Sequence, residues 1–215
     1  MRCACVLNSL SAKQSIAMFR AVHSPIRGQI QLIFGPMFSG KTTELVRRLN
    51  RYRMAGQCCL FVTYGKDRQG IFQSVSTHDK QSHSAIRATT LADLRTLAIY
   101  YSVIAIDEGQ FFPDVETFAE DMADRGKIVI VAALDGTFQR KAFGNMLQLV
   151  PLAESVVKLT AICMLCFGEA SFTQRVGPPD IRVGEYKSVC RTCYQQQTCD
   201  GDLAMTSNNC FTTNV

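Results

Sequence analysis

A glycine-rich stretch near the start of the chain has the composition of a phosphate-binding loop. Residues 35–42 read Gly-Pro-Met-Phe-Ser-Gly-Lys-Thr and match the pattern GxxxxGK[ST] without a mismatch. In such a loop, backbone N–H groups surround phosphate oxygens at the start of a helix, while Lys41 would place its charge beside the β- and γ-phosphates. The Thr42 hydroxyl can bind Mg²⁺. The residues predicted to contact ATP here are Gly35, Pro36, Met37, Phe38, Ser39, Gly40, Lys41 and Thr42.

An apolar run that ends in two acids supplies the second half of such a site. Residues 103–106 read Val-Ile-Ala-Ile, and Asp107 and Glu108 follow directly. An aspartate at the carboxyl end of a buried strand predicts a magnesium ligand, which would act together with Thr42. Glu108 lies past the strand end, where a carboxylate can accept a proton from an attacking hydroxyl or water. Alone, the pair would fit a helix cap or a solvated turn equally well, but a phosphate-binding loop favours the catalytic interpretation.

Four of the ten cysteines form two Cys-x-x-Cys pairs, Cys163 with Cys166 and Cys190 with Cys193. Four thiolates complete a tetrahedral shell around Zn²⁺ and leave no position for water, so this zinc is predicted to fold a module and not to catalyse. Two redox-active pairs are the alternative, disfavoured because neither pair begins a helix in a βαβ unit. Because the chain is large and lacks a signal-peptide core, its cysteines indicate a reducing compartment.

Short apolar runs alternate with helical patterns over the first part of the chain. The strand-like runs are residues 29–34, 58–62, 103–106 and 128–134. They are rich in Val and Ile and bounded by polar residues, which suits strands covered on both faces. The first helical pattern follows the glycine-rich loop and ends at Gly56. The β-α-β-α-β order predicts an α/β fold of the P-loop NTPase type, a mostly parallel sheet flanked by helices, and this context disfavours a chance glycine-rich turn.

Later in the chain the pattern changes twice. A second helical pattern runs from Val115 to Met122, with Asp114 as its predicted N-cap and Gly126 just beyond its end. After about residue 160 we expect short segments around the cysteines, with no good helix. The predicted regions are a basic N-terminal arm (1–27), a P-loop domain (28–160), a small ribbon-like zinc module with a substrate-covering loop (161–194) and a C-terminal tail (195–215).

Composition excludes several classes of protein. Residues 1–27 contain no acid, as in a transit peptide, but their weak amphipathic pattern favours a disordered arm. The net charge is +5 with 19% charged residues, and the dense basic blocks of nucleic-acid tails are missing. No apolar run approaches the roughly 18 to 20 residues that span a bilayer. We therefore expect a soluble protein with neither a nucleic-acid nor a membrane partner.

Several motifs together carry a family resemblance. Residues 36–41 (Pro-Met-Phe-Ser-Gly-Lys), 107–112 (Asp-Glu-Gly-Gln-Phe-Phe) and 134–140 (Leu-Asp-Gly-Thr-Phe-Gln-Arg), with the four cysteines, resemble the type II thymidine kinases of animals and poxviruses. The likeness runs from about Arg27 to Tyr194. It implies that Glu108 is the general base for the 5′-hydroxyl of thymidine, and that the enzyme is a homotetramer. The further nucleotide contacts that it implies are Asp67, Arg68, Asp107 and Gln110.

The resemblance also implies a nucleoside pocket. Its implied contacts are Met37, Phe111, Leu134, Phe138, Thr173, Ile181, Val183, Gly184 and Tyr186. Apolar walls suit a flat, methylated pyrimidine, although without the resemblance Phe111 and Phe138 would be interpreted as core aromatics. Asp67 and Arg68 are adjacent where the family has an intervening residue, which leaves the role of Arg68 open. The loop 175–186 is shorter than in the animal enzymes and lacks their double glycine. We therefore expect retained chemistry with weaker or broader nucleoside selection, thymidine still being preferred over deoxycytidine.

The sequence thus predicts a kinase that transfers a phosphoryl group from ATP to thymidine and also to deoxyuridine, with Mg²⁺ and structural Zn²⁺. A cytoplasmic location is expected, with a mitochondrial one as the alternative if the acid-free arm is a transit peptide. A P-loop ATPase that binds single-stranded nucleic acid through its zinc module is the alternative function, but that module has few aromatic residues. A kinase inactivated by its short loop is a third interpretation, which the intact P-loop and acidic pair oppose.

Overall fold

A computed structural model of the chain describes residues 27–65, 73–76, 82–176 and 185–202. Seven strands form one sheet in the order β3-β4-β2-β5-β6-β1-β7. Its neighbouring strands are parallel except β3 and β4, which are antiparallel. The strands are β1 (Gln29–Gly35), β2 (Cys59–Tyr64), β3 (Gln73–Ser76), β4 (Ser82–Ala88), β5 (Val103–Asp107), β6 (Ile128–Leu134) and β7 (Ser155–Lys158). This confirms the predicted α/β fold with a mostly parallel sheet.

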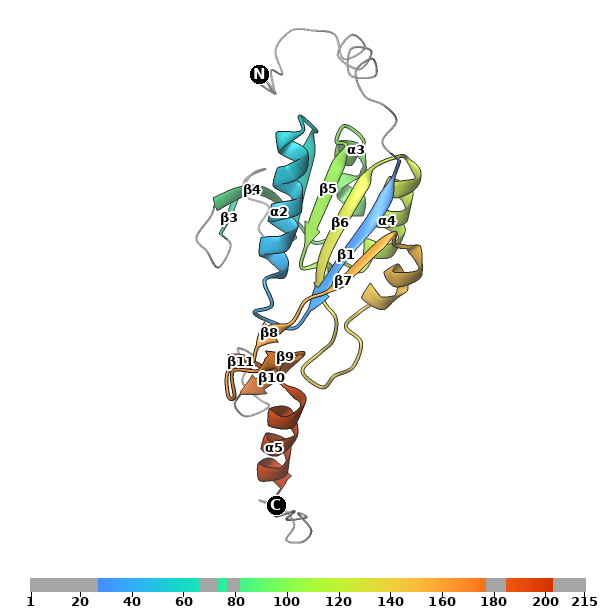
Figure 1. The fold of residues 1–215 in the computed structure, drawn as a ribbon. Coiled ribbons are helices and arrows are strands. Elements are labelled where there is room, and N and C mark those ends of the chain that lie inside the picture. The colour runs from blue at the N-terminus through green and yellow to red at the C-terminus, as the bar shows by residue number, and fades with distance from the viewer. Residues whose placement is uncertain (1–26, 66–72, 77–81, 177–184, 203–215) are drawn as a thin grey trace, which may run out of the picture.

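Helices cover both faces of the sheet (Figure 1). α2 (Lys41–Met54) lies on one face, whereas α4 (Val115–Asp124) and the short α3 (Arg95–Ala98) lie on the other. The 3-10 helices are η1 (Ala92–Leu94), η2 (Gly109–Phe111) and η3 (Met146–Leu152). Among the described helices, none combines the length and apolar composition that a membrane span requires.

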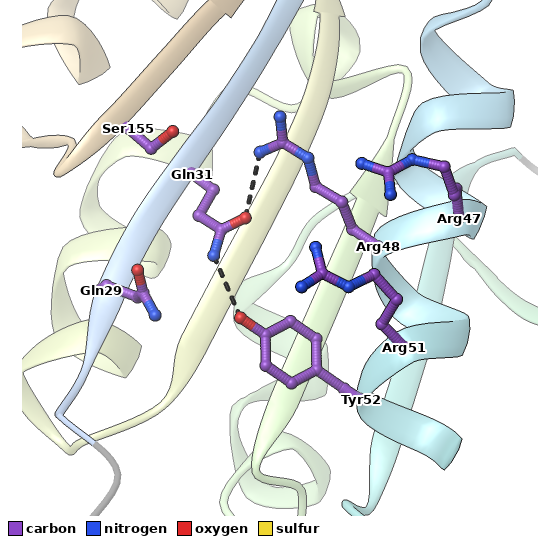
Figure 2. Close-up of a pocket in the computed structure, with 7 residues that line it drawn as sticks. All are labelled: Gln29, Gln31, Arg47, Arg48, Arg51, Tyr52 and Ser155. Atoms are coloured by element: carbon purple, nitrogen blue, oxygen red, sulfur yellow. Dashed lines mark hydrogen bonds between the residues drawn. The ribbon is translucent and has the colours of Figure 1, made fainter. Parts of the chain in front are cut away.

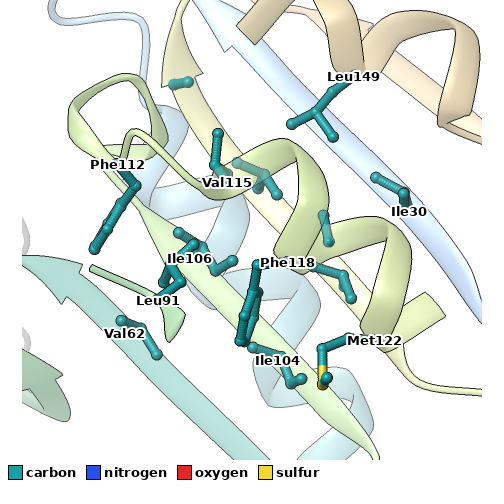
Figure 3. Packing of buried hydrophobic residues seen from close by; sticks show 14 of the residues in the cluster. Ile30, Val62, Leu91, Ile104, Ile106, Phe112, Val115, Phe118, Met122 and Leu149 are labelled. Atoms are coloured by element: carbon teal, nitrogen blue, oxygen red, sulfur yellow. The ribbon is translucent and has the colours of Figure 1, made fainter. Parts of the chain in front are cut away.

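Each face of the sheet has its own apolar cluster. Along β5, Ile104 belongs to the cluster beneath α4, whereas Val103 belongs to the cluster beneath α2. Figure 3 shows Phe118 of α4 lying over Ile104 in the first cluster. The α2 side chains buried in the second cluster are Leu45, Val46 and Leu49. Full burial of each such side chain contributes about 1.5–3 kcal/mol, and strands buried on both faces appear in the sequence as continuous apolar runs.

The ends of the long helices follow the sequence signals. Gly56 (φ +78°) and Gly126 (φ +79°) adopt the left-handed conformation just after α2 and α4, as predicted. Asp114 occupies the N-cap position of α4, but its side chain makes no capping hydrogen bond there. Its carboxylate instead accepts the backbone N–H groups of Leu91 (3.1 Å) and Ala92 (2.7 Å). Asp114 therefore fixes the start of η1 against the start of α4.

The C-terminal part forms a small module at the end of the sheet towards which β1 and β5 run (Figure 1). Strands β8 and β9 pair antiparallel, and β10 and β11 form a two-stranded ribbon. The elements are β8 (Ala161–Ile162), β9 (Glu169–Ala170), β10 (Phe172–Val176), β11 (Glu185–Val189) and α5 (Arg191–Asp202). Buried Ala161, Ala170 and Val189 form a separate core with two of the cysteines. The predicted ribbon-like module is therefore present.

Helix α5 corrects one expectation. The sequence predicts no good helix after residue 160, which is wrong, because α5 follows Cys190 directly and continues past residue 194. The helical segment is rich in glutamine and has no apolar stripe, so helical periodicity does not reveal it. At its start, the backbone N–H of Cys193 donates to Sγ of Cys190 at 3.4 Å. The cysteine cluster, and not an amphipathic face, thus determines where this helix begins.

Candidate active site and zinc centre

The glycine-rich loop joins the end of β1 to the start of α2, as its pattern requires. Gly40 adopts φ +78°, and Lys41 is the first residue of the helix. Ser39 Oγ and Lys41 Nζ both donate to the carbonyl oxygen of Pro36, at 2.9 and 2.7 Å. A Cβ added to Gly35 would lie 2.5 Å from Ser39 Oγ, so the compact loop requires glycine there. The loop thereby places Lys41 at a helix N-terminus, an arrangement that binds phosphate.

Thr42 and Asp107 meet beside this loop, although 65 residues separate them. Thr42 Oγ1 donates to Asp107 Oδ2 at 2.9 Å and lies 3.2 Å from Oδ1. Burial and the neighbouring Glu108 carboxylate raise the pKa of Asp107 to about 6, against the hydrogen bond from Thr42. Burial also lowers the pKa of Lys41, while the carboxylates of Glu108, Asp107 and Asp135 oppose that shift. The hydroxyl and carboxylate oxygens are hard ligands, and they fit a Mg²⁺ ion held beside a nucleotide.

Glu108 lies in a strained turn immediately after β5. Its φ of +56° and ψ of +39° are left-handed, which is rare for a residue with a side chain. A Cβ added to Gly109 would lie 2.6 Å from Val131 Cγ1, so the turn packs tightly on β6. Gln110 Nε2 donates to Glu108 Oε2 at 2.5 Å, and the backbone N–H of Leu134 donates to Gln110 Oε1 at 3.1 Å. The predicted base is therefore held at the same edge of the sheet as the glycine-rich loop.

The predicted nucleoside contacts come from several segments. Thr173 on β10 is 6% exposed, and its Oγ1 accepts the backbone N–H of Met37 at 2.9 Å. Phe111 is 44% exposed, and therefore it is not a core residue. Leu134, the last residue of β6, and Phe138, in the segment after β6, are both half-buried, and Tyr186 is half-buried on β11. Asp67, Arg68, Ile181, Val183 and Gly184 lie outside the described residues, so the structure does not test their predicted roles.

The structure adds aromatic and cationic neighbours that the sequence did not indicate as site residues. Phe111 contacts Tyr64 and Phe143, with ring centroids 5.3 and 5.6 Å away. Tyr194 on α5 donates its hydroxyl to the carbonyl oxygen of Phe138 at 2.8 Å. The Arg140 guanidinium lies 4.4 Å from the ring centroid of the same tyrosine. Because 56 residues separate Tyr194 from Phe138, no local pattern could have revealed this contact.

The four cysteines form a compact cluster between β8 and α5. Their Sγ atoms all lie within 4.8 Å of one another, and those of Cys166 and Cys190 are 3.6 Å apart. Zn–S bonds of about 2.3 Å in a tetrahedron place sulfur atoms roughly 3.8 Å apart, so the cluster fits Zn²⁺. Within the described part of the chain, it is the only group of three or more metal-ligating side chains of this kind. The predicted quartet of Cys163, Cys166, Cys190 and Cys193 is thus assembled.

The electrostatics of this cluster also suit a metal. The backbone N–H of Cys193 donates to Cys190 and lowers the pKa of that thiol. Burial opposes ionisation of Cys163, but backbone N–H groups around it lower its pKa to about 6. The hydrogen bond with Cys190, followed by burial, raises the pKa of Cys193 to about 12. Because Cys163 and Cys190 favour the thiolate and Cys193 resists it, the positive charge of a metal would complete the ionisation.

A polar pocket of about 340 Å³ lies elsewhere, between α2 and the strands β1 and β7 (Figure 2). Its lining residues are Gln29, Gln31, Arg47, Arg48, Arg51, Tyr52 and Ser155. Gln31 Oε1 accepts from Arg48 at 3.0 Å, and Gln31 Nε2 donates to the Tyr52 hydroxyl at 3.2 Å. Arg47 and Arg48 also pair with Glu44, at 2.6 and 2.8 Å. This pocket contains none of the predicted site residues.

The phosphate-binding loop and the acidic strand end beside it, both at one edge of a mostly parallel sheet, place the chain in the P-loop class of α/β proteins, with a small four-cysteine module that fits zinc. The chain belongs to the thymidine kinase family, whose family model matches residues 28–194. Cytosolic thymidine kinase from Gallus gallus is 57% identical over 176 residues, which cover 80% of this chain and 79% of the relative. The cytosolic thymidine kinase of Homo sapiens is 56% identical over 176 residues, which cover 80% of this chain and 75% of the relative. The thymidine kinase of Vaccinia virus (strain Western Reserve) is 57% identical over 173 residues, which cover 78% of this chain and 97% of the relative.

Proposed function

We propose that the protein transfers the γ-phosphoryl group of ATP to the 5′-hydroxyl of thymidine, and also of deoxyuridine, in the salvage of DNA precursors. The observation that carries the proposal is the contact between Thr42 and Asp107, at 2.9 Å. It joins the phosphate-binding loop to the acidic strand end and places Glu108 one residue away. Family membership supports a kinase that uses ATP, and the half-exposed Phe111 supports a pocket for a flat base.

Each residue would have a distinct part in the reaction. The loop N–H groups and Lys41 bind the phosphates, while Thr42 and Asp107 hold Mg²⁺, which neutralises charge on the β- and γ-phosphates when bound. Glu108 accepts the proton of the 5′-hydroxyl as the 5′-oxygen bonds to the γ-phosphorus. The bond from that phosphorus to the β–γ bridging oxygen breaks, so ADP and dTMP are the products. Most of the rate enhancement would come from positioning and charge neutralisation.

The nucleoside would bind between the end of β6 and the zinc module. The described residues proposed to line this pocket are Met37, Phe111, Leu134, Phe138, Thr173 and Tyr186. Contacts from Ile181, Val183 and Gly184, nucleotide contacts from Asp67 and Arg68, and broader selection by the short loop stay predictions. The zinc is proposed to be structural, since four sulfur ligands leave no open position. We also propose a homotetramer in the cytoplasm, as the resemblance implies.

A coupled assay of ADP release tests this function directly, with thymidine, deoxyuridine, deoxycytidine and single-stranded DNA compared as second substrates or activators. Thymidine and deoxyuridine should stimulate ADP release, and thymidine should outperform deoxycytidine. Glu108→Gln should bind both substrates yet lose about 10²- to 10⁴-fold in kcat. Lys41→Ala should also weaken ATP binding, because it removes charge from the phosphates. Stimulation by DNA without any by thymidine would replace the proposal with the ATPase alternative.

A further inference from the structure

We propose that Gln110 is a positioning residue that holds the carboxylate of Glu108 for proton transfer, and that this is its role in place of the ATP contact implied by the resemblance. The inference rests on the proposed function, because it assigns Gln110 to the base of that reaction. Gln110 is only 6% exposed, and both ends of its side-chain amide are hydrogen-bonded. A buried amide with both ends satisfied favours one fixed orientation.

The backbone determines which way this amide points. The N–H of Leu134, the last residue of β6, is a donor only, so the amide atom that faces it at 3.1 Å must be the carbonyl oxygen. The amide nitrogen is therefore directed at Glu108, where it donates to Oε2 at 2.5 Å. That hydrogen bond engages one carboxylate oxygen and leaves Oε1 to accept the proton of a substrate hydroxyl. Gln110 thus selects both the direction of the base and the oxygen that reacts.

The turn around Glu108 explains why the base needs such support. Glu108 occupies a left-handed conformation (φ +56°), and the 3-10 helix η2 follows it at once. Within the turn, the N–H of Phe111 donates to the carbonyl oxygen of Glu108 at 3.1 Å, but this bond restrains only the backbone. Within the part of the chain that the structure describes, Gln110 is the only side chain that donates a hydrogen bond to the Glu108 carboxylate. Free rotation of the carboxyl group would reduce the fraction of molecules in the reactive geometry.

The contact also connects the base to the substrate side of the site. Leu134 begins the segment 134–140, which is proposed to line the nucleoside pocket, and β6 pairs with β1 at Gly35. Gln110 therefore fixes the carboxylate relative to the strand ends that carry both substrates. A shift of the base by about 1 Å can reduce a rate by roughly 10²-fold, so a positioning residue of this kind should act on kcat.

Two variants separate the two hydrogen bonds. Gln110→Glu keeps an oxygen that can accept from the Leu134 N–H but replaces the donor to Glu108 with a like charge. Gln110→Met keeps the length of the side chain and removes both bonds. Both should lower kcat by about 10- to 100-fold, while the KM values for ATP and thymidine change by less than about threefold. Gln148→Glu, an exposed position on η3, makes the same charge change and should leave both parameters unchanged. Zinc content and thermal melting identify any variant that does not fold.

Combining Gln110→Glu with Glu108→Gln provides the decisive comparison. If Gln110 acts through the base, the double variant should be no slower than Glu108→Gln alone, because the residue it positions is already disabled. An equal further loss in that background would overturn the inference, as would wild-type kcat in Gln110→Glu. A raised KM for ATP with unchanged kcat would establish the nucleotide contact instead. Absence of thymidine phosphorylation by the wild-type protein would refute the proposed function itself, which is a separate outcome.

Discussion

Replacing Asp107 by Asn should make the magnesium-free protein more stable while it abolishes catalysis. Asp107 is 5% exposed, and burial together with the adjacent Glu108 carboxylate raises its pKa from 3.8 to about 6. A buried carboxylate with a raised pKa destabilises the fold whenever it is ionised, because the unfolded chain solvates that charge better. Asn has nearly the same shape and can still accept from the Thr42 hydroxyl, but it carries no charge. The variant therefore removes the penalty together with the ligand for Mg²⁺.

The pKa difference sets the magnitude and its pH dependence. Below pH 3.8 the carboxyl is protonated in both states, so it contributes no penalty. As pH rises from 3.8 towards 6, the unfolded chain loses the proton and the folded protein retains it, so stability falls. The penalty reaches roughly 1–2 kcal/mol at pH 5 and about 3 kcal/mol at pH 8, where both states are ionised. Imperfect hydrogen bonding of the new amide reduces the observed gain, so we expect roughly 1–3 kcal/mol at pH 8.

Urea unfolding at pH 5 and pH 8 measures this effect, in buffer without Mg²⁺ and without a chelator, since a chelator would also remove zinc. Asp124→Asn, at an exposed position on α4, makes the same chemical change and should alter stability by less than about 0.5 kcal/mol. Adding Mg²⁺ and ATP should stabilise the wild-type protein far more than Asp107→Asn. A variant that is no more stable than the wild type at pH 8, or equally stabilised at both pH values, would refute the burial argument.

Two further predictions concern the C-terminal module. Elemental analysis should find one zinc per chain, and Cys193→Ser should lower the yield of folded protein, because zinc binding energy is folding energy for so small a module. Cys58→Ser, which lies outside the quartet, is the control and should not lower the yield. If protein purified without chelator contained no metal, the assignment of the four cysteines as zinc ligands would be wrong. Tyr194→Phe removes the 2.8 Å hydrogen bond to Phe138 but keeps the ring, so the KM for thymidine should rise by roughly 2- to 10-fold, as expected for about 0.5–1.5 kcal/mol. The KM for ATP should not change, and a shift in that parameter alone would show that the contact serves the other substrate.

Sequence reasoning located the centre of the fold but not its periphery. The runs that became β1, β2, β5 and β6 are mostly apolar, because helices cover both faces of the sheet that these strands form. Strand β4 reads Ser-His-Ser-Ala-Ile-Arg-Ala and β7 only Ser-Val-Val-Lys, so neither has a distinctive pattern. Helix α5 escaped prediction for a related reason, since its start lies at the cysteine cluster and not at an apolar face. Hydrophobic periodicity reveals a helix or strand only where burial requires apolar residues at regular positions.

Some features of the candidate site were likewise predictable from the sequence, and others were not. The phosphate-binding loop and the pair Asp107 and Glu108 were predictable because each is a contiguous pattern that follows a strand. The function of Gln110 as a support for Glu108 was not, because it depends on a backbone N–H from Leu134, which is 24 residues away. The contact of Tyr194 with Phe138 likewise joins distant segments. The chemical role of a side chain can be inferred from its residue type, whereas the contacts that orient it come from distant segments and depend on topology.

The same topology gives the zinc module a part in both halves of the site. Its strand β10 accepts the N–H of Met37, in the phosphate-binding loop, through Thr173 Oγ1 at 2.9 Å. Its helix α5 contacts the segment after β6 through the Tyr194 hydroxyl. Both elements emerge from one small core to which Cys163 and Cys193 of the quartet belong. Loss of zinc should therefore disturb the position of the nucleotide loop and the nucleoside pocket together, even though the metal site itself has no open position for chemistry.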